Sequence, residues 1–446
     1  MAAGAGALRL LEWEARALLT RLARVRSFAL SETMVPAAAV SFEAQTAVER
    51  HVARGRRALG RLVRQYVRWL RGPEARRAPP AEAQRRFTFL RLQFNAILSQ
   101  FDIFADVMTQ RSEHETGVWL SGLDAVAADA LGLPGGYYET PPVMCYLDRG
   151  HGAAIRRART RLPGGPENPV AIIRVPRERM VGTGVASSLI HEVGHQGAAL
   201  LGLVESLQPV LRGLQQRGGE EQIVWRCWER WVSETVADLW SVGRVGIAAT
   251  HGLMGVVSLP RFFVFQVNLG DPHATPWIRV KMSCAMGKAL YPDVQWDVLS
   301  QLWTALYPLD SLDPARRDLL ETLEASLPAV ATLLVEHRPA ALRGKSLREV
   351  LSAAQRQPAR LRALYQGWHA DRQQMYAAPP SLACAVIGQA GADGAISPES
   401  ESLILGELLT HWALRSALDR SAIRVAPRLQ ASGPIDERAV VGLGVR

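Results

Sequence analysis

The chain has 446 residues, of which 48% are hydrophobic and 21% are charged, a composition typical of a water-soluble globular protein with two or three domains. The net charge of +10 comes almost entirely from arginine, interspersed with acidic residues, so we expect no nucleic-acid surface. The four cysteines form no C-x-x-C pair, which argues against a zinc ribbon or a dense disulfide framework and fits a reducing compartment.

The N-terminal region, residues 1–83, is predicted to be a basic helical region that ends in a linker. Its first helix is amphipathic, and charged residues interrupt the apolar core that a signal peptide needs. The linker at residues 71–83 is rich in Pro, Ala and Arg. No apolar run is long enough for a membrane span. We expect a cytoplasmic protein, with secretion by a route without a signal peptide left open.

The remaining chain is predicted to form a core at residues 84–295 and a helical C-terminal domain at residues 296–446. Turn-rich segments separate short strands from helices, which indicates an α+β fold that is mainly helical with a small sheet. The elements expected in the core are helices over residues 84–131, strands at 143–147 and 170–176, a helix from Thr183 to about 207, and a helix over about 221–242.

The sequence H-E-V-G-H at residues 191–195 has the spacing of a zinc peptidase helix. Residues four apart share one face of a helix, so His191 and His195 can direct two imidazole nitrogens at one metal ion. Glu192 can then act as the general base that takes a proton from the attacking water. A chance match is expected in about one of a hundred such chains. The competing interpretation is an ordinary buried helix with two satisfied histidines.

A third ligand would decide between these interpretations. Ala198 and Leu201 stand where a metzincin has glycine and histidine, which excludes that class. Glu205 lies too far along the same predicted helix. Glu234 is the best candidate, because Asp238 follows one turn later and can accept the outer N–H of a ligand histidine. The alternative is that this pair belongs to a solvated acidic face.

H-E-V-G-H followed by E-x-x-x-D on a second helix resembles the gluzincin zinc metallopeptidases. S-E-T-V-A-D is similar to the matching helix of the HtpX and CAAX-prenyl-protease group, and the segment D-P-H-A-T-P-W-I-R-V, with His273 and Arg279, is similar to that group's third motif. The chain departs from the group at Ala274, in a shorter gap before Glu234, and in its lack of membrane spans. The resemblance covers roughly residues 185–285.

The resemblance implies a zincin-like core with one zinc ion per chain. It implies that His191, His195 and Glu234 are the metal ligands and that Glu192 is the catalytic residue. It also implies that the strand at residues 170–176 is an edge strand able to pair with an extended peptide.

The residue that stabilises the oxyanion is left open by the residues themselves. His273 is the first choice and Tyr291 the second, while Arg279 can hold either of them or bind a substrate carboxylate. His251 is an alternative ligand or donor.

We therefore expect a zinc-dependent metallopeptidase, a hydrolase acting on a peptide or protein substrate. The alternative is a degenerate zinc-binding or scaffold protein of peptidase ancestry. The helical flanks are larger than a catalytic core needs and are able to recruit a protein partner.

Overall fold

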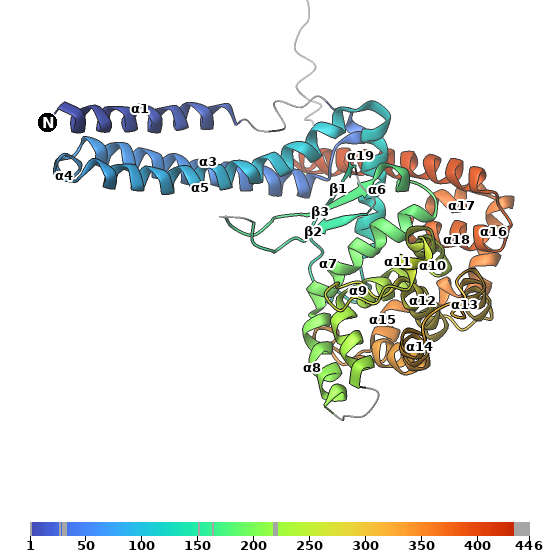
Figure 1. Cartoon of the computed structure of the whole chain (residues 1–446). Coiled ribbons are helices and arrows are strands. Elements are labelled where there is room, and N and C mark those ends of the chain that lie inside the picture. The colour runs from blue at the N-terminus through green and yellow to red at the C-terminus, as the bar shows by residue number, and fades with distance from the viewer. Residues whose placement is uncertain are drawn as a thin grey trace, which may run out of the picture.

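The computed structural model describes residues 2–25, 28, 34–149, 152–162, 165–216 and 222–431. Over these residues the chain is mainly helical and contains one small three-stranded sheet, as predicted. A long arm of helices projects from a larger helical body, and the sheet lies where the two meet (Figure 1). None of the described helices is both long and apolar enough to cross a lipid bilayer.

Three helices make the arm: α1 (Ala2–Arg24), α3 (Phe42–Arg71) and α5 (Pro80–Thr109). Ser41 caps α3 by accepting a hydrogen bond from the backbone N–H of Ala44. The apolar faces of the three helices share one core. The short helix α4 (Pro73–Arg77) turns the chain back, and the Tyr66 hydroxyl donates to the Ala83 carbonyl at 2.9 Å. The predicted linker is therefore a turn within the arm, and the boundary predicted at residue 83 falls inside α5.

The sheet has the strand order β1-β3-β2. Strand β1 (Val143–Asp148) runs parallel to β3 (Ala171–Pro176), and β2 (Ala154–Arg156) pairs with β3 in the antiparallel direction. Both predicted strands are thus confirmed. The expectation that the second of them is an edge strand is wrong, because β2 forms from a segment with no strand pattern and covers its outer side.

Strand β1 is an edge whose hydrogen-bonding groups are already used. Its Cys145 N–H donates to Asp124 at 2.7 Å, and its Leu147 backbone exchanges two hydrogen bonds with the Gln110 side chain at 2.7 and 2.8 Å. Arg111 pairs with Asp124 and also donates to the Cys145 carbonyl at 2.7 Å. On β2, the Arg156 carbonyl accepts a hydrogen bond from the Asn168 side chain at 3.2 Å, and the backbone groups of Ala154 and Ile155 have no side-chain partner among the described residues.

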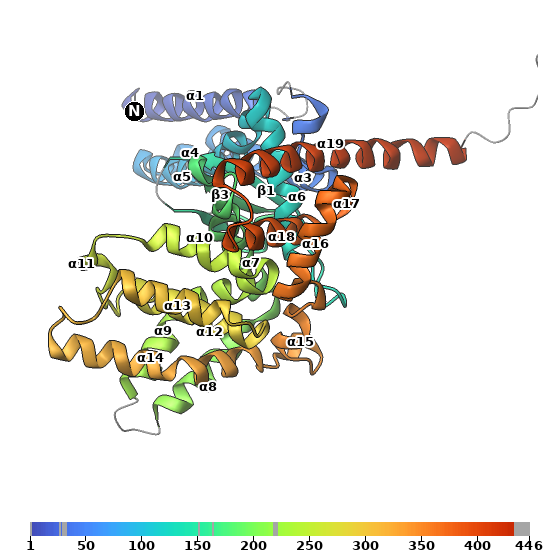
Figure 2. The same ribbon diagram turned by 90° about the vertical axis from the view of Figure 1, so that its right-hand side faces the viewer.

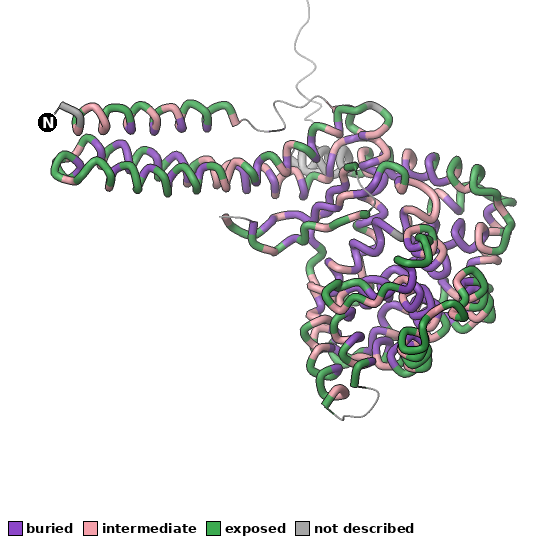
Figure 3. Tube along the Cα trace, viewed as in Figure 1, coloured by how far each residue is buried: buried purple, intermediate pink, exposed green. Residues whose placement is uncertain are grey.

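The two faces of the sheet belong to different cores. Side chains alternate along a strand, so Met144 and Ile172 join the core of the arm while Cys145 and Ile173 join the core of the body. The tube in Figure 3 shows both interiors as buried segments on either side of the sheet. The helices up to residue 109 therefore contribute to one core and the helices after residue 113 to the other, with the sheet lying between them.

The body contains the helices that follow the arm, and α19 extends away from it as a long rod (Figure 2). These helices are α6 (His114–Leu131), α7 (His191–Leu201), α8 (Leu203–Gln215), α9 (Gln222–Val245), α10 (Ile247–Val257), α11 (Arg261–Val264), α12 (Pro276–Leu290), α13 (Gln295–Leu306), α14 (Pro314–Val335), α15 (Leu347–Leu351), α16 (Pro358–Ala370), α17 (Arg372–Ala377), α18 (Pro380–Ala392) and α19 (Pro398–Ala431).

The helix predicted from Thr183 to about residue 207 is divided in the structure. It opens with a π-helical segment, Val185–Ile190, continues as α7, and ends at Gly202, whose φ of 61° is left-handed. A new helix, α8, then begins, and Pro209 lies inside it instead of ending it. Glycine favours this break because it adopts the left-handed region without strain.

Candidate metal centre

The centre is built where α7 crosses α9 with almost no space between their backbones. A Cβ atom on Gly194 would lie 2.7 Å from the Ala237 carbonyl oxygen, and one on Gly197 would lie 2.5 Å from the Trp240 ring. Only glycine fits at such distances. The close crossing brings the histidine face of α7 against Glu234 on α9.

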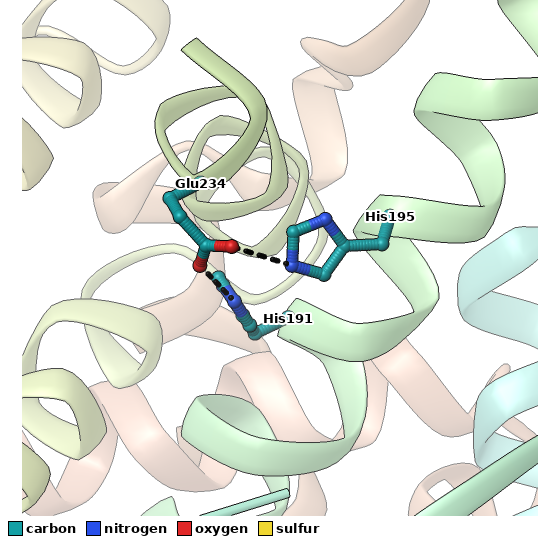
Figure 4. Close-up of side chains that lie close together, drawn as sticks. All are labelled: His191, His195 and Glu234. Carbon is teal, nitrogen blue, oxygen red and sulfur yellow. Dashed lines mark hydrogen bonds and ion pairs between the residues drawn. The ribbon is translucent and has the colours of Figure 1, made fainter. Parts of the chain in front are cut away.

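His191, His195 and Glu234 form one compact cluster (Figure 4). Each offers one ligand atom, and these atoms lie within 4.8 Å of one another. The Nε2 atoms of His191 and His195 lie 3.2 and 3.4 Å from the two carboxylate oxygens of Glu234. The two imidazole rings are nearly perpendicular, at 85°. The structure thus places all three predicted ligands together.

The cluster has the donor types of a zinc site, and its two imidazole–carboxylate distances, 3.2 and 3.4 Å, are close to the spacing of zinc ligands. Tetrahedral zinc with nitrogen and oxygen ligands at about 2.0–2.2 Å holds neighbouring ligand atoms roughly 3.3–3.5 Å apart. Two imidazoles and one carboxylate are the donor set of catalytic zinc sites, which keep the fourth position open. All of these donor atoms belong to protein side chains.

Asp238 and Arg279 support the cluster from behind. The Nδ1 atom of His191 lies 2.8 Å from an Asp238 oxygen, although the ring N–H does not point straight at it. Arg279 donates to both Asp238 oxygens, at 2.7 and 2.8 Å, and its guanidinium lies 3.7 Å from Glu234. Asp238 thus favours the tautomer that leaves Nε2 of His191 free for a metal. Arg279 thus holds Asp238 and not His273 or Tyr291, as had been predicted, and its other predicted role, binding a substrate carboxylate, stays a prediction.

The buried charges of the centre change one another's protonation. Burial disfavours the charged form of His191, but Asp238 and Glu234 outweigh it and raise the pKa of His191 to about 9. Burial also works against the charged form of Glu234, yet hydrogen bonding to His191 and His195 holds the pKa of Glu234 well below its usual range. Without a metal, a proton therefore occupies His191, and a cation must displace that proton when it binds.

Glu192 lies beside the ligands on α7 and is buried. Burial raises the pKa of its carboxyl group, while the neighbouring His191 and His195 lower it in part. No described residue donates a hydrogen bond to this carboxylate, so it is available to a substrate or a water molecule. A carboxyl group with a raised pKa suits proton transfer near neutral pH.

His273 stands at the exposed side of the cluster, on the loop before α12. Its Nε2 lies 3.5 Å from a Glu234 oxygen. Asp271 accepts hydrogen bonds from both its ring Nδ1 and its backbone N–H, at 2.7 and 2.9 Å. Arg230, one turn before Glu234 on α9, donates to the carbonyls of Leu269 and Gly270 and holds the same loop.

Asp271 and Arg230 were missed by sequence reasoning. Asp271 had a local signal, since an aspartate two residues before the residue it binds forms an Asx turn. Arg230 had none, because its partners are backbone carbonyls of a segment about forty residues away.

The structure does not bring Tyr291 or His251 to the cluster. Tyr291 is buried, and its hydroxyl donates to the carbonyls of Gly243 and Leu351 at 2.6 and 3.2 Å. Gly243 lies nine residues beyond Glu234, roughly 13 Å along the α9 axis. His251 lines an apolar cavity between α10 and α13. The sequence alone could not show where these two side chains point. Neither Tyr291 nor His251 serves as the oxyanion donor or as a metal ligand.

The chain matches no known family model, no curated protein and no solved structure.

Proposed function

We propose that the protein is a zinc-dependent metallopeptidase of the gluzincin type that hydrolyses peptide bonds. One observation carries the proposal: two imidazole Nε2 atoms and a carboxylate converge within 4.8 Å, and a buried glutamate follows the first histidine. The ligands would be His191, His195 and Glu234, with one zinc ion per chain. The helix crossing that creates the cluster also supports a zincin-like core.

When bound, zinc supplies a Lewis acid that polarises a substrate carbonyl group and acidifies water at the site. The protein's own residues then move the protons. Glu192 takes a proton from the attacking water and returns it to the leaving amine, a role to which its raised pKa is suited. His273, with Nδ1 held by Asp271, donates from Nε2 to the substrate oxyanion in its protonated form.

The open edge of β2 is the proposed place for the substrate backbone. The segment that follows β2 is fixed to the ligand helix, since Ala158 N–H donates to Gln196 on α7 at 2.8 Å. A peptide that adds to this edge gains main-chain hydrogen bonds and lies along a strand whose following segment is fixed to the ligand helix. The outer edge of β1 offers no such groups because Asp124 and Gln110 already occupy them.

The test is the Glu192→Gln variant, with Glu205→Gln on the exposed face of α8 as its matched control. Zinc content is measured by mass spectrometry, and cleavage is measured on an unfolded protein substrate. Glu192→Gln is expected to keep about one zinc per chain and lose cleavage by at least about a hundredfold, while the control keeps both. Retained cleavage by zinc-loaded Glu192→Gln contradicts the role of Glu192.

The same assay separates the proposal from the scaffold alternative. Wild-type protein purified without added zinc is expected to hold the metal and to lose both cleavage and thermal stability with a chelator. Zinc bound without any cleavage favours a degenerate peptidase, and no zinc at all contradicts the metal centre.

A further inference from the structure

Helix α3 carries a continuous row of arginines along one side. Successive members are three or four residues apart, the spacing that keeps side chains on one face of a helix. All of them are exposed. We call this set the arginine row: Arg50, Arg54, Arg57, Arg61, Arg64, Arg68 and Arg71.

The arginine row lies opposite the face that α3 buries. Val48, Leu59 and Val63 are buried in the core that α3 shares with α1 and α5, and the row falls on the other side of the helix. From Arg50 to Arg71 there are 21 residue steps, which extend about 32 Å at 1.5 Å per step. Because the arm projects from the body, this length is open to a large partner (Figure 1).

Most of the row has no acidic partner among the residues that the structure describes. Arg71 pairs with Glu12 of α1 at 2.5 Å, and none of the other six forms an ion pair with a described residue. Two buried arginines outside the arm differ, since Arg111 and Arg279 are each paired with an aspartate. Arg57 and Arg64 also line a groove of about 460 Å³ between α1 and α3.

The net charge of the protein is concentrated in the arm. Residues 1–109 contain 18 arginines and nine acidic residues, whereas the whole chain has 52 basic and 42 acidic residues. The arm therefore accounts for +9 of the +10 net charge. The expectation of scattered, interspersed arginine does not hold in three dimensions, because the row appears only once residues 42–71 are seen as one helix with one buried face.

We propose that the arm binds duplex nucleic acid, with the arginine row along the phosphate backbone. Arginine forms forked hydrogen bonds to phosphate oxygens, and a row of about 32 Å is close to one duplex turn of about 34 Å. Backbone contacts of this kind do not read sequence. The proposal is independent of the metallopeptidase function and uses none of its residues.

A membrane surface is the less suited partner. A helix that lies in a membrane interface inserts its apolar face into the lipid. The apolar face of α3 is already used inside the arm, and the row leaves only Leu62 among the large hydrophobic residues exposed along it. Helix α3 exposes a narrow row of positive charge, which is complementary to a linear polyanion such as a duplex and less so to a flat membrane surface.

The test measures binding of a fluorescein-labelled 20-base-pair DNA duplex to the full chain by anisotropy at 50–300 mM salt. If the six unpaired arginines each neutralise a phosphate, the slope of log K against log salt is about −5. The triple variant Arg57→Glu, Arg61→Glu, Arg64→Glu is expected to weaken binding at least tenfold. The milder triple change to Gln, which decides the test if the Glu variant does not fold, is expected to reduce the slope by about three.

The matched control replaces with glutamate three exposed arginines of the body that have no ion pair with a described residue: Arg360, Arg372 and Arg415. It changes the net charge equally and is expected to alter affinity less than twofold. No binding at 50 mM salt, or equal weakening by both triple variants, overturns the proposal. So does stronger binding to vesicles containing phosphatidylserine that displace the duplex, which would assign the row to a membrane.

Discussion

The arm and the body of this protein share one sheet but differ in where their charged residues lie. The body buries charged groups in pairs, as with Arg279 and Asp238 behind the metal ligands, and it is almost electrically neutral. The arm keeps its buried face apolar and turns its arginines to solvent. Buried charge must be paired and positioned, which suits chemistry on a bound molecule, whereas exposed unpaired charge suits recognition of a large polyanion.

The largest expected effect is confined to the body and follows removal of a ligand. His195→Ala should lower the zinc content at least about tenfold and cleavage by about a hundredfold or more, because the remaining two groups do not complete the site. Duplex binding by the arm should stay unchanged. His369→Ala, on the exposed side of α16, is the control. Loss of duplex binding in His195→Ala would show that the two regions do not act separately.

Removal of one partner of the buried pair should destabilise the body strongly. Arg279→Leu removes the guanidinium from buried Asp238 and leaves only His191 beside this carboxylate, which is expected to lower the free energy of unfolding by about 3–5 kcal/mol in urea titrations. The double variant Arg279→Leu, Asp238→Leu should recover much of this loss, since no unpaired charge stays behind. Hydrogen exchange in α3 should not change in either variant; faster exchange there would contradict separate cores.

A methyl group at the crossing of α7 and α9 should have a smaller effect. Gly194→Ala places Cβ 2.7 Å from a backbone carbonyl oxygen, so the helices must separate. We expect a loss of about 1–3 kcal/mol in stability, with weaker zinc binding. Gly213→Ala, on the open side of α8, meets no atom within 4 Å and should stabilise the protein by up to about 1 kcal/mol. Equal results for both variants would contradict the close crossing.

The smallest effect concerns pH and the arm. Burial lowers the pKa of His51, against a partly opposing hydrogen bond to Gln100 at 3.2 Å. The unfolded chain therefore binds more protons below about pH 6.5, so stability is full above that pH and declines as the pH falls through it. His51→Gln should flatten this acid decline, measured by hydrogen exchange in α3 and α5, whereas His369→Gln should not. An unchanged decline in His51→Gln would assign it to other groups.

The parts of the site that depend on local spacing were predictable from the sequence. His191 with His195, and Glu234 with Asp238, are one helical turn apart, so helix geometry alone assigns each pair to one face. The structure brings these two faces together. The strands at residues 143–147 and 170–176 were also predicted correctly, because their apolar residues stand between clear turns.

The parts that depend on distant segments were not predictable. The place of β3 in the sheet depends on β2, which has only three residues. The orientation of the Tyr291 side chain is set by hydrogen bonds from its hydroxyl to the carbonyls of Gly243 and Leu351. The spacing within residues 42–71 indicates an arginine face opposite an apolar face, but that α1 and α5 are the helices covering the apolar face does not follow from it.

Most side chains on both faces of β1 and β3 are buried and apolar, so hydrophobicity fixes the alignment of these strands mainly through their few polar positions. A slip of one residue in β3 would exchange Ile172 with Ile173 between the two cores and would also carry Arg174, now beside Asp148, into the core of the body. The polar contacts along β1 add to this discrimination, since Asp124 meets Cys145 N–H and Gln110 meets Leu147. Misaligned folding intermediates should therefore accumulate when Gln110 is replaced by Leu, even though the size of both cores is preserved.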